Sequence, residues 1–128
     1  MKICHVAPWT RDPEAQRAFW QAMFGANSNQ RHLNKNRPGF ASYFMRLREG
    51  ATIELMTLPE VEAGQTGQEM TGWAHIAIAP GDEHQVDEMA VRAAESGILI
   101  APPRRTGDGF DEAIIRDSDG NLIELVAE

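Results

Sequence analysis

The stretch Asp117–Leu125, Asp-Ser-Asp-Gly-Asn-Leu-Ile-Glu-Leu, places the charged Glu124 inside an otherwise apolar strand pattern. Its Asp-Gly-Asn segment favours a chain reversal, because Gly and Asn tolerate positive φ angles, and the aliphatic residues that follow favour a strand. A carboxylate buried in such a strand destabilises the fold by several kcal/mol unless it is paired, protonated or bound to a metal. Glu124 therefore requires a partner.

The same pattern, Gly-x-x-Ile-Glu-Leu, occurs 70 residues earlier, where Glu54 takes the place of Glu124. The same offset pairs His5 with His75, and no insertion or deletion is needed to keep the register. A pattern repeated at one fixed offset predicts a duplication of a structural unit. The chain is therefore expected to contain two similar modules.

Length limits how these modules are organised. The 128 residues suffice for one globular domain with a core, whereas half of them would be marginally stable alone. We therefore expect a single domain over 1–128, built from modules 1–57 and 72–128. The polar segment 58–71, rich in Gly and Gln, is predicted to be the linker.

Each module is predicted to have the order βαβββ. The predicted elements are strands at 2–8, 29–35, 40–47 and 51–57 with a helix from the cap Asp12 to Phe24 and its C-cap Gly25, then strands at 72–79, 98–101, 110–116 and 121–127 with a helix between Asp82 and Gly97 and a loop at 102–109. The fold class is α+β: two tandem βαβββ modules that form a curved, mixed sheet cup with the helices on the outside.

Strand alternation predicts where the repeated His and Glu side chains point. In each module they lie opposite the most aliphatic face of their strands, which should cover the helix. Two facing modules would bring together the His-Glu-His-Glu set, defined as His5, Glu54, His75 and Glu124. Two imidazoles and two carboxylates suit one divalent metal per site: Ni, Co, Mn, Fe or Zn. The alternative is that both pairs are salt bridges retained from the duplication.

Charge and cysteine content exclude other classes. The net charge of −7 and the pI near 5.0 give no electrostatic support for binding nucleic acid or an anionic membrane. The single Cys4, expected in the core, excludes an internal disulfide and suits a reducing compartment. With no signal peptide and no apolar run of membrane-spanning length in the sequence, we expect a cytoplasmic protein.

Basic residues occupy corresponding regions of the two modules: Arg31, Lys35 and Arg37 in the first, Arg104 and Arg105 in the second. In an acidic protein, these groups are candidates to bind a carboxylate or phosphate of a small, anionic substrate. The alternative for each group is an ordinary solvated loop. Trp73, on the predicted strand face of His75, would line the substrate site or pack in the core.

The His-Glu-His-Glu set in two βαβββ modules resembles the vicinal oxygen chelate superfamily. That group includes glyoxalase I, fosfomycin-resistance transferases, extradiol dioxygenases, methylmalonyl-CoA epimerase and bleomycin-binding proteins. The segments Asp12–Gly25 and Arg116–Leu125 are similar to the family's first helix and its ending strand. The resemblance covers essentially the whole chain. It implies the same fold, and a homodimer, because family members often exchange modules between chains.

Among these proteins, the set looks most like that of glyoxalase I. The resemblance implies a divalent-metal-dependent lyase or isomerase that acts on a small α-oxygenated substrate through metal-chelated enediolate chemistry. One glutamate would move a proton between adjacent carbons, and Glu124 is slightly preferred to Glu54 for this role.

Two other functions remain open: a metal-dependent resistance-type transferase or ring-cleaving dioxygenase, and a non-enzymatic small-molecule binding protein of the same fold. Dioxygenases of the family use two His and one Glu, so a fourth ligand at Glu54 argues against them. Binding-only members generally lack the metal ligands. In bacterial glyoxalase I an Asn shortly after the first Glu contacts glutathione, but Leu55–Leu58 contains no Asn. A substrate other than a glutathione adduct therefore fits as well.

Overall fold

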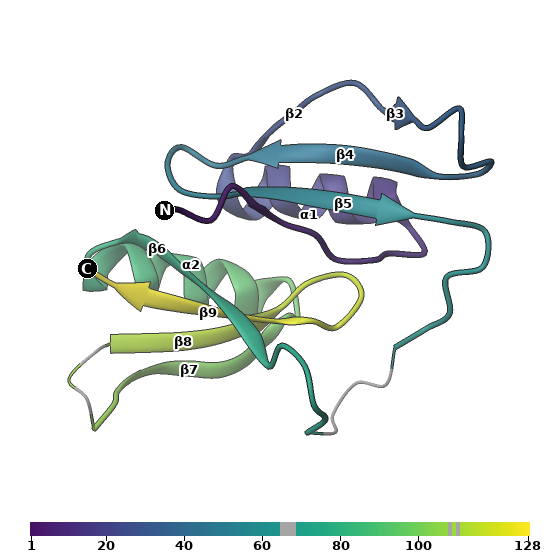
Figure 1. Ribbon diagram of the computed structural model, residues 1–128. Coiled ribbons are helices and arrows are strands. Elements are labelled where there is room, and N and C mark those ends of the chain that lie inside the picture. The colour runs from purple at the N-terminus through teal and green to yellow at the C-terminus, as the bar shows by residue number, and fades with distance from the viewer. Residues whose placement is uncertain (65–68, 108, 110) are drawn as a thin grey trace. The chain divides into compact units, whose positions relative to one another are not determined.

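The computed structural model describes residues 1–64, 69–107, 109 and 111–128. The chain divides into two compact units, Met1–Gly64 (unit 1) and Gln65–Glu128 (unit 2). Each unit contains one helix and one mixed sheet, so the predicted α+β class with two repeated modules is confirmed (Figure 1). Parts of the predicted linker (65–68), of the loop at 102–109 (108) and of the strand at 110–116 (110) lie outside the described residues.

Unit 1 has six elements: β1 (His5–Val6), α1 (Pro13–Phe24), β2 (Asn27–Ser28), β3 (His32–Leu33), β4 (Ala41–Arg46) and β5 (Thr52–Thr57). Its sheet has the order β1-β5-β4-β2, and β3 also pairs with β4. Of the strand predicted at 29–35 only β3 is present, and β2 lies just before the predicted range. The reason lies at Asn29, whose side-chain Oδ1 accepts the Phe44 N–H at 2.8 Å in place of a backbone acceptor.

The described part of unit 2 has five elements: β6 (His75–Gly81), α2 (Glu83–Glu95), β7 (Leu99–Arg105), β8 (Asp111–Arg116) and β9 (Leu122–Ala127). Its sheet has the order β6-β9-β8-β7. The loop predicted to begin at Pro102 was wrong, because β7 continues to Arg105. A strand passes through Pro102 and Pro103 because β7 lies at the sheet edge and its pairing with β8 has register shifts on both sides of Ala101.

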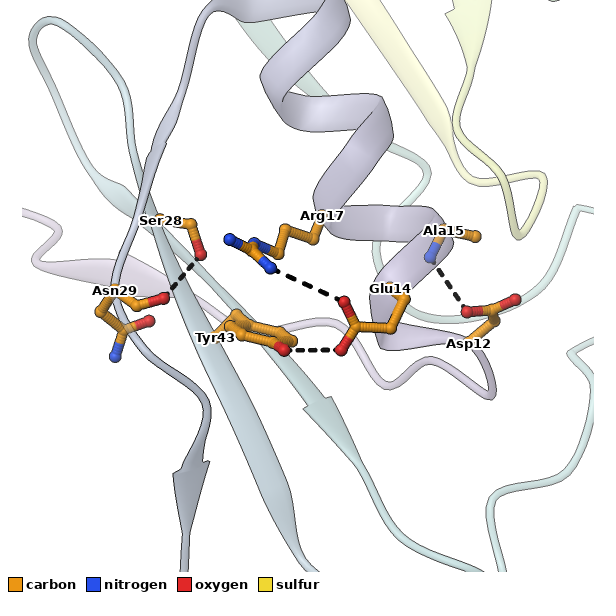
Figure 2. A network of polar contacts seen from close by, with 7 residues as sticks. All are labelled: Asp12, Glu14, Ala15, Arg17, Ser28, Asn29 and Tyr43. Atoms are coloured by element: carbon orange, nitrogen blue, oxygen red, sulfur yellow. Dashed lines mark hydrogen bonds and ion pairs between the residues drawn. The ribbon is translucent and has the colours of Figure 1, made fainter.

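Side-chain caps fix both helix starts. Asp12 Oδ1 accepts the Ala15 N–H at 2.9 Å (Figure 2), and Asp82 forms a capping box with Gln85. Gly25 ends α1 with a φ of 61°. The predicted caps Asp12, Gly25 and Asp82 are therefore confirmed, and α2 ends at the C-cap Ser96, directly before the predicted Gly97. In the described part of the chain, neither helix is long and apolar enough to cross a membrane.

The helix of each unit packs on one face of its sheet, as Figure 1 shows for α1 across β4 and β5. The buried aliphatic residues of β5 and β9 alternate with the more exposed Glu54 and Glu124, as strand parity predicts: Ile53 and Leu55 in β5, Ile123 and Leu125 in β9. The expectation that Cys4 lies in the core was wrong. Cys4 is exposed because β1 begins only at His5.

The stretch Asp117–Leu125 contains the turn between β8 and β9, at residues 117–121, and the start of β9, as expected. Asp117 Oδ1 accepts the backbone N–H groups of Asp119 and Asn121 at 2.9 and 2.8 Å, and its Oδ2 accepts the Asn121 side-chain amide at 2.8 Å. Gly120 has a φ of 89°, which an L side chain rarely adopts. This turn fixes the register of β9, and with it the face on which Glu124 lies.

Candidate metal centre

In unit 1, the parallel pairing of β1 with β5 brings His5 next to Glu54. His5 is in register with Thr52, and Glu54 follows on the same face of β5. The His5 Nε2 lies 3.6 Å from Glu54 Oε2, with the side chains 49% and 15% exposed. Phe44, the cross-strand partner of Glu54 in β4, meets the imidazole edge to face at a centroid distance of 6.2 Å. The pair is therefore half-covered and flanked by an aromatic ring.

Unit 2 repeats this geometry. His75 is in register with Leu122, two residues before Glu124. The His75 Nε2 lies 3.4 Å from Glu124 Oε2, with the side chains 45% and 17% exposed. The cross-strand partner of Glu124 is Ile114, at the position that Phe44 occupies in unit 1. The register positions of His75 and Glu124 lie 70 residues after those of His5 and Glu54, so at this pair the sequence repeat is also a repeat in space.

Both pairs have a spacing suited to two ligands of one ion. Their N···O distances of 3.6 and 3.4 Å exceed the usual hydrogen-bond range. Two atoms each about 2.1 Å from an ion are separated by roughly 3.0 Å at an octahedral angle and 3.4 Å at a tetrahedral one. Among the described residues of either unit, no group of three or more His, Cys, Asp or Glu is placed to hold a metal. Each pair therefore offers two ligands with a spacing that suits one ion.

The two arginines of β7 point to opposite faces of the sheet. Arg104 pairs with Glu112, which pairs in turn with Val126, so Arg104 lies on the face of Glu124. Arg105 pairs with Asp111 on the other face, where its Nη1 lies 3.8 Å from Asp111 Oδ2. Of these two predicted substrate-binding residues, only Arg104 shares a face with a His–Glu pair.

Arg105 belongs instead to an acidic region at the start of α2. A hydrogen bond with Asp111 and the negative charge of that residue raise the pKa of Glu83, and Arg105 opposes the shift. An open hollow of about 640 Å³ lies here, lined by Asp82, Glu83, His84, Gly109, Asp111, Ala127 and Glu128. The lining does not include His75 or Glu124, so this hollow is separate from the His–Glu pair.

The other predicted substrate-binding residues lie near strand ends. Arg31 and Lys35 are exposed on either side of β3. The charge of Arg31 acts on the Tyr43 hydroxyl, which lies on the sheet face covered by α1. Trp73 precedes β6 and is 78% exposed. Among the described residues, no ion pair or ring contact joins any of these three to a His–Glu pair.

Sequence reasoning missed Trp9 on the His5–Glu54 face. Trp9 forms a parallel bridge with Met56, which alternates onto the face of Glu54. The even spacing from His5 to Trp9 is the signal that would have found it, since residues separated by an even number share a strand face. This residue lies beyond the end of β1, so strand prediction alone did not draw attention to it.

The family model described as Glyoxalase/Bleomycin resistance protein/Dioxygenase superfamily matches residues 2–125. Curated protein sequences give no significant match.

Solved structures give the same fold. A glyoxylase/bleomycin resistance protein/dioxygenase domain from Frankia sp. EAN1pec has a TM-score of 0.86 at 16% identity, over 99% of this chain and 91% of that one. Lactoylglutathione lyase from Agrobacterium tumefaciens has a TM-score of 0.69 at 21% identity, over 98% and 92%. A possible glyoxalase from Bacillus cereus has a TM-score of 0.71 at 27% identity, over 98% of both chains.

Proposed function

This chain belongs to the Glyoxalase/Bleomycin resistance protein/Dioxygenase superfamily, and from that premise we propose that it is a divalent-metal-dependent lyase or isomerase of the glyoxalase I type. The observation that carries the proposal is the His–Glu pair found at the same place in both units, with N···O distances of 3.6 and 3.4 Å. A half-exposed ion pair contributes only about 0–1 kcal/mol to stability, so stability alone gives little reason for two matched pairs.

In this proposal one divalent ion per site, Ni, Co, Mn, Fe or Zn, is held by His5, Glu54, His75 and Glu124. The donor set contains imidazole and carboxylate without thiolate, which suits these ions. Four protein ligands on a six-coordinate ion leave two positions for neighbouring oxygens of a small α-oxygenated substrate. When bound, the ion supplies Lewis acidity that stabilises negative charge on those oxygens.

The chain's own contribution to the reaction is proton transfer. We assign Glu124 to take a proton from one substrate carbon and return it to the adjacent carbon, with Glu54 as the second candidate. The isomerisation gains and loses no atoms, so no further reactant is needed. Both carboxylates are largely covered, which restricts exchange of the held proton with water. His5 and His75 act as neutral ligands, because a protonated imidazole nitrogen cannot bind a metal.

We also propose that the protein forms a homodimer. The two half-sites would meet either within one chain or between the two chains of the dimer. Both arrangements give one ion per chain, so metal stoichiometry tests the site whichever arrangement holds. Light scattering after size-exclusion chromatography tests the dimer separately.

The first experiment is metal analysis of protein purified without chelators. We expect one divalent ion per chain, bound with micromolar or tighter affinity and lost in Glu54→Gln and His75→Ala, one variant from each unit. His84→Ala is the matched control, because His84 Nε2 lies 3.4 Å from Glu88 Oε1 in an exposed pair outside the site. A wild-type protein that binds no divalent ion at micromolar concentration would overturn the proposal.

Turnover assays then separate the reaction classes. The metal-loaded protein is screened with α-ketoaldehydes in the presence of several thiols, where isomerisation supports the proposal. Oxygen consumption with Fe(II), or thiol-dependent opening of an epoxide, would identify a dioxygenase or a transferase instead. Binding of planar ligands that survives metal removal, without any turnover, would identify a binding protein.

A further inference from the structure

Trp9, Arg37 and Phe40 form one cluster in unit 1. The guanidinium carbon of Arg37 lies 5.5 Å from the Trp9 ring centroid and 5.8 Å from that of Phe40. The two rings meet edge to face at 6.3 Å and 87°. Trp9 is 43% exposed, and Arg37 is exposed. No ion pair among the described residues involves Arg37, so its charge is held by the rings rather than neutralised by an acid.

A rigid turn sets the cluster in place. Arg37-Pro38-Gly39-Phe40 is a β-turn closed by the Phe40 N–H, which donates to the Arg37 carbonyl at 3.0 Å. Proline at the second position and a glycine with a φ of 81° at the third are the features of a type II turn. Gly39 also packs tightly, since a Cβ there would lie 2.6 Å from Pro59 Cγ. Arg37 and Phe40 are therefore held at the two ends of a fixed turn.

The cluster lies on the sheet face of the His5–Glu54 pair. Trp9 bridges to Met56, and the Met56 N–H donates to the Pro8 carbonyl at 3.1 Å. Met56 and Glu54 share a face and are separated by two residues, roughly 7 Å along the strand. An elongated molecule lying along β5 would therefore reach the carboxylate of Glu54 and the rings at the same time.

Two residues of this cluster are not repeated in the second module. At the repeat offset, Trp9 and Arg37 correspond to Ala79 and Gly107. The His–Glu pair is present in both units and Phe40 has a sequence counterpart in Phe110, whereas the Trp9 ring and the Arg37 guanidinium stacked on it belong to unit 1 alone. A requirement of the module's fold would apply to both units, so the cluster points to a task particular to one end of the site.

We propose that Arg37, stacked on Trp9 and Phe40, is a specificity-determining residue that binds an anionic oxygen group, a carboxylate or a phosphate, of the substrate. The inference rests on the proposed function, and it narrows the substrate to an elongated anion whose reacting oxygens lie near Glu54. A guanidinium stacked on a ring keeps its in-plane N–H donors available for bidentate binding of such a group. The rings supply an apolar surface for the part of the substrate between its anionic group and its reacting oxygens.

A binding experiment tests the proposal without turnover or metal. Isothermal titration of the full chain, with and without chelator, compares 3-(benzylthio)propanoate with its neutral amide and with phenethyl phosphate. We expect the wild type to bind one of the anions at least about tenfold more tightly than the amide, and the tighter anion identifies the group. Arg37→Gln should abolish this preference and Arg37→Lys should retain part of it.

Arg48→Gln is the matched control, because it removes the same charge from the exposed turn at the opposite end of β4. It should keep the wild-type preference. Equal binding of the anions and the amide by the wild type would overturn the proposal. An equal loss of the preference for the anion in Arg37→Gln and Arg48→Gln would also overturn it. Circular dichroism establishes that each variant is folded. The binding measurement requires neither metal nor turnover, so it tests the role of Arg37 even if the lyase proposal fails.

A kinetic experiment links Arg37 to the proposed reaction. Phenylglyoxal adducts of 3-mercaptopropionate, which is anionic, and of 2-mercaptoethanol, which is neutral, serve as the two substrates. Arg37→Gln should raise KM about tenfold for the anionic adduct, with kcat unchanged, and leave the neutral adduct unaffected. Equal effects on both adducts would assign Arg37 a structural role and overturn the proposal.

Discussion

The two units hold matching His–Glu pairs in surroundings that differ. The Nε2–Oε2 distances are 3.6 and 3.4 Å, and the strand registers correspond residue by residue at the repeat offset. On the opposite face of each sheet, which the helix covers, the two units have different side chains. The ligand pair depends on strand register and on one face of the sheet, so the opposite face was free to change without moving it.

The helix face of unit 1 contains a buried polar pair. Gln16 Oε1 accepts the Trp20 Nε1–H at 3.2 Å, and both residues are at most 1% exposed. Trp20 also stacks on Phe24 at a centroid distance of 4.9 Å. The corresponding positions of unit 2 are Val86 and Ala90, also buried but without polar side chains. Unit 1 therefore relies on one large aromatic residue where unit 2 relies on close packing of small ones.

A second difference is the network between α1 and β4 (Figure 2). The Tyr43 hydroxyl donates to Glu14 Oε1 at 2.5 Å, and Arg17 Nη1 lies 3.7 Å from Glu14 Oε2. The Arg17 guanidinium also lies over the Tyr43 ring at 5.1 Å. Ala113 takes the place of Tyr43 in unit 2, so this network cannot form there.

The largest expected effect is on kcat, and it tests whether the two His–Glu pairs have different roles. At saturating metal, Glu124→Gln should lower kcat by roughly 10²–10⁴-fold, because it removes the proposed base. Glu54→Gln should lower kcat less, once extra metal offsets its weaker binding. Steady-state kinetics over a metal titration measures both variants. A larger loss of kcat in Glu54→Gln than in Glu124→Gln would assign the base to unit 1. Equal losses of kcat in the two variants would contradict a single base.

The next effect concerns the helix faces. Trp20→Ala should destabilise the protein by about 3–5 kcal/mol, because it leaves a large cavity and removes the indole N–H that donates to Gln16. Urea unfolding followed by circular dichroism measures this loss. Trp20→Phe should cost less, since it keeps most of the volume. A loss below about 1 kcal/mol for Trp20→Ala would show that unit 1 packs as unit 2 does.

The smallest effect concerns the network that unit 2 lacks. Tyr43→Phe should destabilise the protein by about 1–2 kcal/mol at neutral pH, because Glu14 loses its hydroxyl donor. The hydrogen bond to Glu14, together with burial, raises the pKa of Tyr43 above its ordinary value of 10.0.

The sign of the pH dependence follows from that shift. The folded chain holds the phenol proton more strongly than the unfolded chain, so the stabilisation is complete below pH 10 and is lost as pH rises through the raised pKa. Urea midpoints of wild type and Tyr43→Phe should therefore converge in alkaline solution. Midpoints that differ by the same amount at every pH would contradict the assignment.

The sequence by itself determined the repeat, the order of elements and the faces of the His–Glu pairs. Asp12 and Gly25 mark the ends of α1 through cap chemistry that involves only near neighbours in the chain. The alternation around Glu54 and Glu124 assigns their faces, because side-chain direction in a strand has a fixed period of two. These features depend on local chemistry, and local chemistry can be read from the sequence.

Only the tertiary structure decided which basic residues share a face with the ligand pairs. Arg104 and Arg105 were both expected to bind substrate from a loop, but β7 continues through two prolines to Arg105, so strand alternation places the two side chains on opposite faces. Arg37 lies over Trp9 because a turn after β3 meets the end of the first strand. Edge-strand register and loop docking depend on residues far apart in the chain, and no local pattern contains that information.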